Sequence, residues 1–127
     1  MTEGGLKAMD KVNLLEKFGL FDGTFQPHVV GDLNDHQVKV VKVQGEFVWH
    51  HHETEDELFL VVKGRLRMGL RTGDVVLEEG ELFIVPKGVE HKPSAEEECW
   101  IVLIEPGSTL NTGNVKSERT VENPRRI

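Results

Sequence analysis

Histidine and glutamate side chains occur in this sequence at spacings that suit a metal ion. Three consecutive histidines, His50-His51-His52, are followed by Glu57, and His91 lies further along the chain. Imidazole nitrogens and carboxylate oxygens together suit a divalent transition ion, and a mixed set is compatible with Fe, Mn, Ni, Co or Zn. The sequence therefore predicts one divalent metal site, whose candidate ligands are His50, His52, Glu57 and His91.

The order of these residues indicates how a β-sheet would bring them together. Side chains two positions apart in a strand point to the same face, so His50 and His52 can share one ion while His51 faces away from it. The run Glu-Thr-Glu-Asp that follows predicts a turn, after which Glu57 returns on the partner strand opposite the two histidines. His91, from a distant strand, would complete the set.

This ligand set would leave part of the ion's coordination sphere open. Four protein ligands on an ion that favours six leave two adjacent positions for water, substrate or dioxygen, and the ion would act as a Lewis acid. The alternative is that the histidine run and Glu57 form a solvated polar turn. That alternative does not explain why His91 follows a Pro-x-Gly turn at a suitable distance.

The elements that must position these side chains read as short strands. From about residue 38 to residue 105, runs such as VKVVKV, FVWHHH, LFLVV and CWIVLIE are separated by turns that contain glycine. Many short strands at close spacing favour an antiparallel sandwich or barrel and argue against βαβ units.

The segments on either side of the strands are shorter or more polar. Residues 10–19 predict a short N-terminal helix, with Asp10 as its N-cap and Gly19 as its end. Residues 20–37, which contain several turn-forming residues, predict a loop or a short edge strand. Residues 106–127 predict a polar C-terminal arm.

Composition limits the classes of function. With 127 residues, the chain is expected to form a single domain over residues 1–127. The net charge of −7 argues against nucleic-acid and anionic membrane partners. The single cysteine, Cys99, excludes an internal disulfide and fits a reducing compartment. No apolar run approaches the length of a membrane span and no signal peptide is evident, so we expect a cytoplasmic protein with a small-molecule ligand.

Two segments punctuated by glycine resemble the two motifs of the cupin superfamily. The first segment carries Gly45, His50, His52, Glu57 and Gly64. The second carries Gly80, Pro86, Gly88 and His91. Cupins are all-β proteins, jelly-roll barrels (double-stranded β-helices) whose motifs bring three histidines and one glutamate onto one metal. The resemblance implies that fold, preceded here by the short N-terminal helix, and implies His50, His52, Glu57 and His91 as the ligands.

The resemblance includes two departures. Four residues separate Gly45 from His50 where the family usually has five, which leaves open whether His51 replaces His50 as a ligand. Ala95 stands where the second motif commonly ends in asparagine. The chain also resembles small cupins labelled as relatives of mannose-6-phosphate isomerase, a label that rests on fold similarity, and fold does not fix function.

The residues beside the candidate ligands are relevant to whether the chain forms a dimer. His51 shares a face with Phe47 and Trp49, so if the ligands point into a barrel, these two aromatic rings point outward. An exposed apolar face needs a cover, which is either the N-terminal helix or a second subunit. Both alternatives remain open, and a homodimer is one expected state.

Other polar residues have weaker signals. His28 and His36 have no partner at ligand spacing and are predicted to lie on the surface or in loops. Arg119, Arg125 and Arg126 could close over an anionic ligand, although a polar terminus is more often without function.

The metal site favours a metal-dependent enzyme that acts on a small polar molecule. Isomerase or lyase chemistry would use a divalent ion as a Lewis acid, whereas dioxygenase chemistry would require a redox-active ion such as iron. The alternatives are a non-catalytic module that binds or senses a small molecule, and a structural protein with an unused site. The sequence does not identify a catalytic acid or base.

Overall fold

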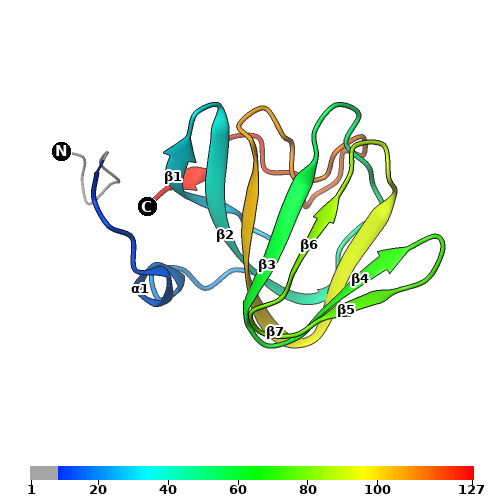
Figure 1. Ribbon diagram of the computed structural model, residues 1–127, viewed down its shortest axis with the longest axis horizontal. Helices are drawn as coiled ribbons and strands as arrows, with labels where there is room; N and C mark the ends of the chain where they lie inside the picture. Colours follow the sequence, from blue (N-terminus) through cyan, green and yellow to red (C-terminus); the bar gives the residue numbers. More distant parts are fainter. Residues whose placement is uncertain (1–8) are drawn as a thin grey trace.

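A computed structural model describes residues 9–127, which form a helix and eight strands (Figure 1). The helix α1 spans Leu14–Phe18. The strands are β1 (His28–Leu33), β2 (His36–Glu46), β3 (Glu57–Lys63), β4 (Leu66–Leu70), β5 (Val75–Leu77), β6 (Leu82–Val85), β7 (His91–Pro106) and β8 (Arg125–Arg126). No helix in residues 9–127 is long and apolar enough to cross a membrane.

The longest strand, β7, organises the sheet. Over its 16 residues it pairs antiparallel with β2 along one edge, and with β4 and then β3 along the other edge. The main path of the sheet runs β5-β4-β7-β2-β1-β8, and β6 is attached through β3. The sheet curves around a common interior but does not close, and β8 lies beside β1 in parallel pairing (Figure 1). The predicted all-β fold with a short N-terminal helix is confirmed.

Two hydrophobic clusters use the two faces of the same strands. Alternation along β2 places Val41 and Val43 in the inner cluster and Val40 in the outer one, as expected for side chains that alternate across a strand. In β7, Ile101 joins the inner cluster and Val102 the outer one. Both faces are therefore covered, which explains why β2 carries valines on both faces instead of alternating cleanly between valine and polar residues.

Phe18 of α1 anchors the outer cluster. Its side chain is fully buried and its ring stacks on Trp100 of β7 with a centroid distance of 4.8 Å. Replacing Phe18 with alanine is expected to lower the free energy of unfolding by about 3–5 kcal/mol, because a large buried ring leaves a cavity. Leu15→Ala is the matched control, since that side chain of the same helix is 62% exposed. Urea denaturation measures both values; equal losses would contradict the packing described.

The helix is shorter than the sequence predicts. It begins after Asn13, whose Oδ1 accepts a hydrogen bond from the Glu16 amide at 3.0 Å, and it ends at Gly19 as predicted. Asn13 caps the helix in place of Asp10, so the prediction over residues 10–19 was wrong at its start. Met9 and Val12, in the segment before the cap, remain exposed and give a longer helix nothing to pack against.

Residues 20–37, predicted to be a loop or a short edge strand, form a loop followed by the short strand β1 near the edge of the sheet. β1 and the start of β2 form a hairpin through Asn34 in the left-handed region (φ 57°). Residues 47–52 were predicted to be a continuous strand, but only His50 forms a ladder contact, an isolated bridge to His91. A register shift in β2 next to Gly45, whose φ is 84°, precedes this irregular segment.

Candidate metal centre

The four predicted ligands lie together inside the sheet. One donor atom from each of His50, His52, Glu57 and His91 falls within 4.8 Å of every other. All four side chains are buried, with relative exposures of 2%, 4%, 3% and 0% respectively. Glu57 opens β3 and His91 opens β7, while His50 and His52 come from the irregular segment before β3. A buried group of three imidazoles and one carboxylate is the donor chemistry of a divalent transition-metal site.

Backbone hydrogen bonds orient two of the imidazoles. Nδ1 of His50 lies 2.8 Å from the Val48 carbonyl oxygen, and Nδ1 of His91 lies 2.9 Å from the Val89 carbonyl oxygen. Because a carbonyl oxygen only accepts, each Nδ1 must carry a proton and donate. A neutral ring then keeps a lone pair on Nε2. This is the arrangement in which an outer hydrogen bond fixes the tautomer of a metal-binding histidine.

The Glu57 carboxylate gives a direct test of whether the group fits a cation. Its Oε1 lies 3.1 Å from Nε2 of His52 and 3.2 Å from Nε2 of His91. Nδ1 of a neutral His91 carries the only ring proton, because it donates to the Val89 carbonyl oxygen. Nε2 would then present a lone pair to the negatively charged oxygen of Glu57, and the two would repel. Either a protonated ring or a positive ion between these atoms removes that conflict. The residues therefore fit a divalent ion, and His50, His52, Glu57 and His91 could hold it.

Burial and hydrogen bonds set the ionisation of the group. Burial and, second to it, the neighbouring His91 lower the pKa of His50 to about 4, so His50 is neutral near pH 7. Burial alone would raise the pKa of Glu57, but hydrogen bonds with His52 and His91 outweigh it and hold the pKa well below its usual range. A neutral imidazole and an ionised carboxylate are the forms that bind a metal.

The C-terminal arm packs directly against the segment of the histidine ligands. The Asn114 amide donates to the His51 carbonyl oxygen at 3.1 Å, and the His51 amide donates back to Asn114 Oδ1 at 2.8 Å. On the other side, the Gly88 amide donates to the His52 carbonyl oxygen at 2.7 Å. His51 itself points its ring to Glu53, with 2.8 Å between Nε2 and Oε2, and is not among the four clustered side chains.

Gly113 allows this close approach. A Cβ at this position would overlap the His51 carbonyl oxygen and lie 3.0 Å from His50 Cδ2, and its φ of 56° also disfavours a side chain. Gly113→Ala is therefore expected to destabilise the fold by more than about 1 kcal/mol and to weaken metal binding by displacing residues 50–52. Thermal unfolding and metal titration measure the two effects. The control is Gly80→Ala, whose φ of 84° is similarly strained but whose Cβ meets nothing within 4 Å; equal metal affinities in the two variants would contradict this account.

Two buried residues next to the ligands were not predicted. Lys39 of β2 and Glu105 of β7 form an ion pair of 2.7 Å with side-chain exposures of 2% and 1%. Glu105 also interacts with Glu57, and burial, followed by the charge of Glu57, raises the pKa of Glu105 well above its usual range while Lys39 opposes the rise. The signal in the sequence was alternation: Lys39 shares its strand face with Val41, and Glu105 shares its face with Leu103.

A small cavity touches the ligand group from inside the sheet. Its volume is about 40 Å³, and its wall includes His50, Glu57 and the aromatic rings of Phe25, Phe47 and Phe59. That volume has room for only a few water molecules, about one per 10–15 Å³ at the lower limit. The ligand group thus faces a mostly apolar space of limited size.

Three predictions about neighbouring side chains need correction. Phe47 does not point outward but belongs to the inner cluster, where its ring meets His50 edge-on at 5.4 Å. The strand break at residues 47–52 is the reason, because it removes the strict alternation that the prediction assumed. The guanidinium of Arg71 lies over Trp49, 3.8 Å from the ring centroid, a cover that neither of the two alternatives named. His28 is buried, at 8% exposure, and stacks on Phe21 at 4.0 Å, whereas His36 is half-exposed as predicted.

Comparison with known proteins places the fold in a family. Residues 37–109 match the family model described as Cupin domain. A cupin-2 domain containing protein from Shewanella frigidimarina is 49% identical, with a TM-score of 0.74 over 75% of this chain and 93% of that one. Protein NMB1881 from Neisseria meningitidis is 30% identical, with a TM-score of 0.70 over 77% of this chain and all (100%) of that one.

A curated relative covers a shorter stretch. The uncharacterized protein YdbB of Bacillus subtilis (strain 168) is 36% identical over 64 residues, which are 50% of this chain. The chain spans only 57% of the length of that relative. The family match over residues 37–109 contains all four candidate ligands. The chain belongs to the cupin family.

Proposed function

We propose that this protein is a divalent-metal-dependent enzyme that acts on a small polar molecule, with His50, His52, Glu57 and His91 as the ligands of one ion. The observation that carries the proposal is the convergence of four buried donor atoms within 4.8 Å of one another. When bound there, a divalent ion would supply Lewis-acid chemistry to oxygen atoms of a substrate. A substrate that presents a carboxylate or carbonyl oxygen suits this chemistry.

The chain's own residues would contribute positioning and exclusion of water. The bonds from Nδ1 of His50 and His91 to backbone carbonyls hold the imidazole rings in one orientation. Phe25, Phe47 and Phe59 keep the inner cavity apolar, which strengthens electrostatic interactions within it. Burial and the charge of Glu57 raise the pKa of Glu105, a carboxyl group outside the ligand set, while its ion pair with Lys39 opposes the rise.

We propose two alternative classes of reaction. Isomerase or lyase chemistry would proceed with any suitable divalent ion, whereas dioxygenase chemistry would stop without oxygen. Fold likeness does not choose between them. Activity of the metal-loaded protein under air and under nitrogen separates the two classes once a substrate is found.

The proposal is tested by asking whether a small ligand binds to open coordination positions on the metal ion. Protein loaded with Co²⁺ is titrated with oxalate, a bidentate oxygen ligand, and the visible absorption bands of Co²⁺ are recorded. We expect the bands to change while Co²⁺ stays with the protein through gel filtration, because open positions on the ion accept the probe. Unchanged bands would mean that the ion has no exchangeable position, and the enzyme proposal would give way to a binding or structural role.

We also propose an assembly state and a location. A homodimer is compatible with the exposed side chains of Leu82 and Ile84 on the edge strand β6, which are 54% and 51% exposed. Sedimentation equilibrium in dilute solution tests it, and a monomeric mass would exclude it. A cytoplasmic location is supported by the one cysteine of the sequence, Cys99, which is free and buried.

A further inference from the structure

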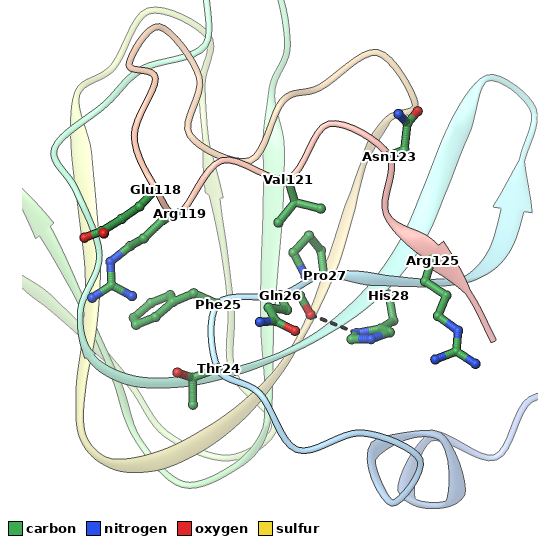
Figure 2. A pocket seen from close by; sticks show the side chains of 10 residues that line it. All are labelled: Thr24, Phe25, Gln26, Pro27, His28, Glu118, Arg119, Val121, Asn123 and Arg125. Carbon is green, nitrogen blue, oxygen red and sulfur yellow. Dashed lines mark hydrogen bonds between the residues drawn. The ribbon is translucent and has the colours of Figure 1, made fainter.

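The charged side chains that line the larger cavity of the molecule lie apart from one another. This outer pocket, with a volume of about 650 Å³, lies between the segment that leads into β1 and the C-terminal arm. Figure 2 shows Arg119 and Arg125 at opposite ends of it, directed away from each other, with Glu118 beside Arg119. Charged side chains meet instead inside the sheet, next to the metal centre, where Lys39 and Glu105 are both buried.

Three neighbouring strands bring Lys39, Glu105 and Glu57 together. In the pairing of β3 with β7, Leu58 lies opposite Ile104, so the next pair in the same register is Glu57 opposite Glu105. On the other side of β7, Lys39 of β2 reaches Glu105, with 2.7 Å between Nζ and Oε2. All three side chains are buried, with relative exposures of 1%, 1% and 3% respectively. Glu105 therefore lies between a buried cation and a candidate metal ligand.

Stability alone does not explain this arrangement. Oε2 of Glu105 forms the ion pair with Lys39, whereas its buried Oε1 has no hydrogen-bond partner among the residues that the structure describes. Carboxylates on opposite residues of neighbouring strands repel each other, and a polar atom buried without a partner is costly. Well-packed apolar side chains in place of a buried ion pair are often neutral or stabilising. We therefore looked for what Glu105 does to its neighbour Glu57.

Glu57 directs one of its two oxygens to the imidazoles. Its Oε1 lies 3.1 Å from Nε2 of His52 and 3.2 Å from Nε2 of His91. Burial alone would raise the pKa of Glu57, and the interactions that outweigh burial are with these two rings and, after them, with Glu105. Glu57 is therefore in contact with Glu105 as well as with the rings. A carboxylate that binds a metal is commonly oriented by such a neighbour, which itself does not touch the ion.

We propose that Glu105 is a positioning residue for the metal ligand Glu57. Lys39 fixes Glu105 through their ion pair, and Glu105 in turn keeps Oε1 of Glu57 directed to the imidazoles, where the ion would be held. A carboxylate that offers one oxygen and not two leaves more of the ion's coordination positions open to a substrate. The inference rests on the metal centre of the proposed function, and it adds two residues outside the ligand set that determine the geometry of that centre.

The test compares Co²⁺ binding by the native protein and by two variants. The dissociation constant is recorded together with the visible absorption bands of Co²⁺, which report the number and arrangement of its ligands. In Lys39→Met/Glu105→Met, the dissociation constant should rise about tenfold or more and the bands should change, as expected when the partner of a metal ligand is lost. Glu105→Gln keeps the shape of the side chain and a hydrogen-bonding group next to Glu57, so its bands should match the native ones.

A control variant separates positioning from general stability. Leu60→Ala changes the strand that carries Glu57, but this side chain packs against the outer cluster. It should lower the stability and leave both the Co²⁺ affinity and the bands unchanged. If Lys39→Met/Glu105→Met fails to fold, Lys39→Met/Glu105→Gln, which removes both charges of the pair, should still have altered bands, because the side chain at position 105 is no longer fixed by Lys39.

The outcomes distinguish this inference from the proposed function. A double variant that binds Co²⁺ with the native affinity and bands, an equal loss in Leu60→Ala, or altered bands in Glu105→Gln would overturn the positioning role of Glu105 alone. A native protein that binds no Co²⁺ would overturn the metal centre and the positioning role together.

Discussion

Replacing Lys39 with methionine is expected to lower the free energy of unfolding by about 3–5 kcal/mol at neutral pH, because it leaves the Glu105 carboxylate buried without a partner. The ion pair between Lys39 and Glu105 is 2.7 Å long and almost fully buried. Glu105 already has an unpartnered oxygen, Oε1, and it adjoins the carboxylate of Glu57. Without Lys39, two neighbouring carboxylates would share one buried site. Urea denaturation measures the loss.

Two further variants identify the cause of this loss. Lys39→Met/Glu105→Met is expected to recover most of the stability, since replacing both partners with apolar residues removes the unpaired charge. The loss in the single variant should also shrink as the pH falls, because a protonated Glu105 has no charge to bury. Lys87→Met, at an exposed position, should change stability by less than about 0.5 kcal/mol. A double variant as unstable as the single one would mean that lost packing, and not charge, is responsible.

Replacing His52 or His91 with alanine is expected to weaken metal binding by about 100-fold or more, given binding free energies of about 10–16 kcal/mol shared among four ligands. Both imidazoles lie within hydrogen-bond distance of Glu57 Oε1. His51→Ala should leave the metal affinity unchanged, because its ring is directed to Glu53 and is not part of the cluster. Titration with Zn²⁺ against a chelating dye measures each affinity.

The comparison between His51 and His52 is the sensitive part of this experiment. They are neighbours with the same side chain, so a general effect of removing an imidazole would appear in both. Equal losses of affinity would contradict the arrangement of the ligands. A loss in His51→Ala with His50→Ala unaffected would mean that His51 replaces His50, the alternative that the spacing from Gly45 left open.

The fold and the grouping of the four side chains could be predicted from the sequence because both depend on local spacing. Short strands separated by glycine turns indicate the fold class. The position of Glu57, shortly after the histidine run and its turn, indicates that Glu57 lies on the next strand. The structure places His50, His52, Glu57 and His91 within reach of one another. That they bind an ion remains a prediction.

The features that the sequence did not predict depend on contacts between distant segments. Phe47 was predicted to point outward because strand alternation was assumed to continue through residues 47–52, which form only an isolated bridge. The role of the C-terminal arm depends on the two hydrogen bonds between Asn114 and His51, which lie 63 positions apart in the chain. The polar composition of the arm does not indicate that it contacts the histidine segment. The pairing of Lys39 with Glu105, 66 positions apart, could be suggested by alternation but not established.

The central claim is that this cupin holds one divalent ion in its buried histidine and glutamate cluster. The most direct measurement is elemental analysis of untagged protein, after reconstitution and gel filtration, beside a His52→Ala/His91→Ala control. We predict close to one transition-metal ion per chain in the native sequence and none in the control. A native protein that carries no metal and takes up none, or a control that binds as much, would contradict the claim.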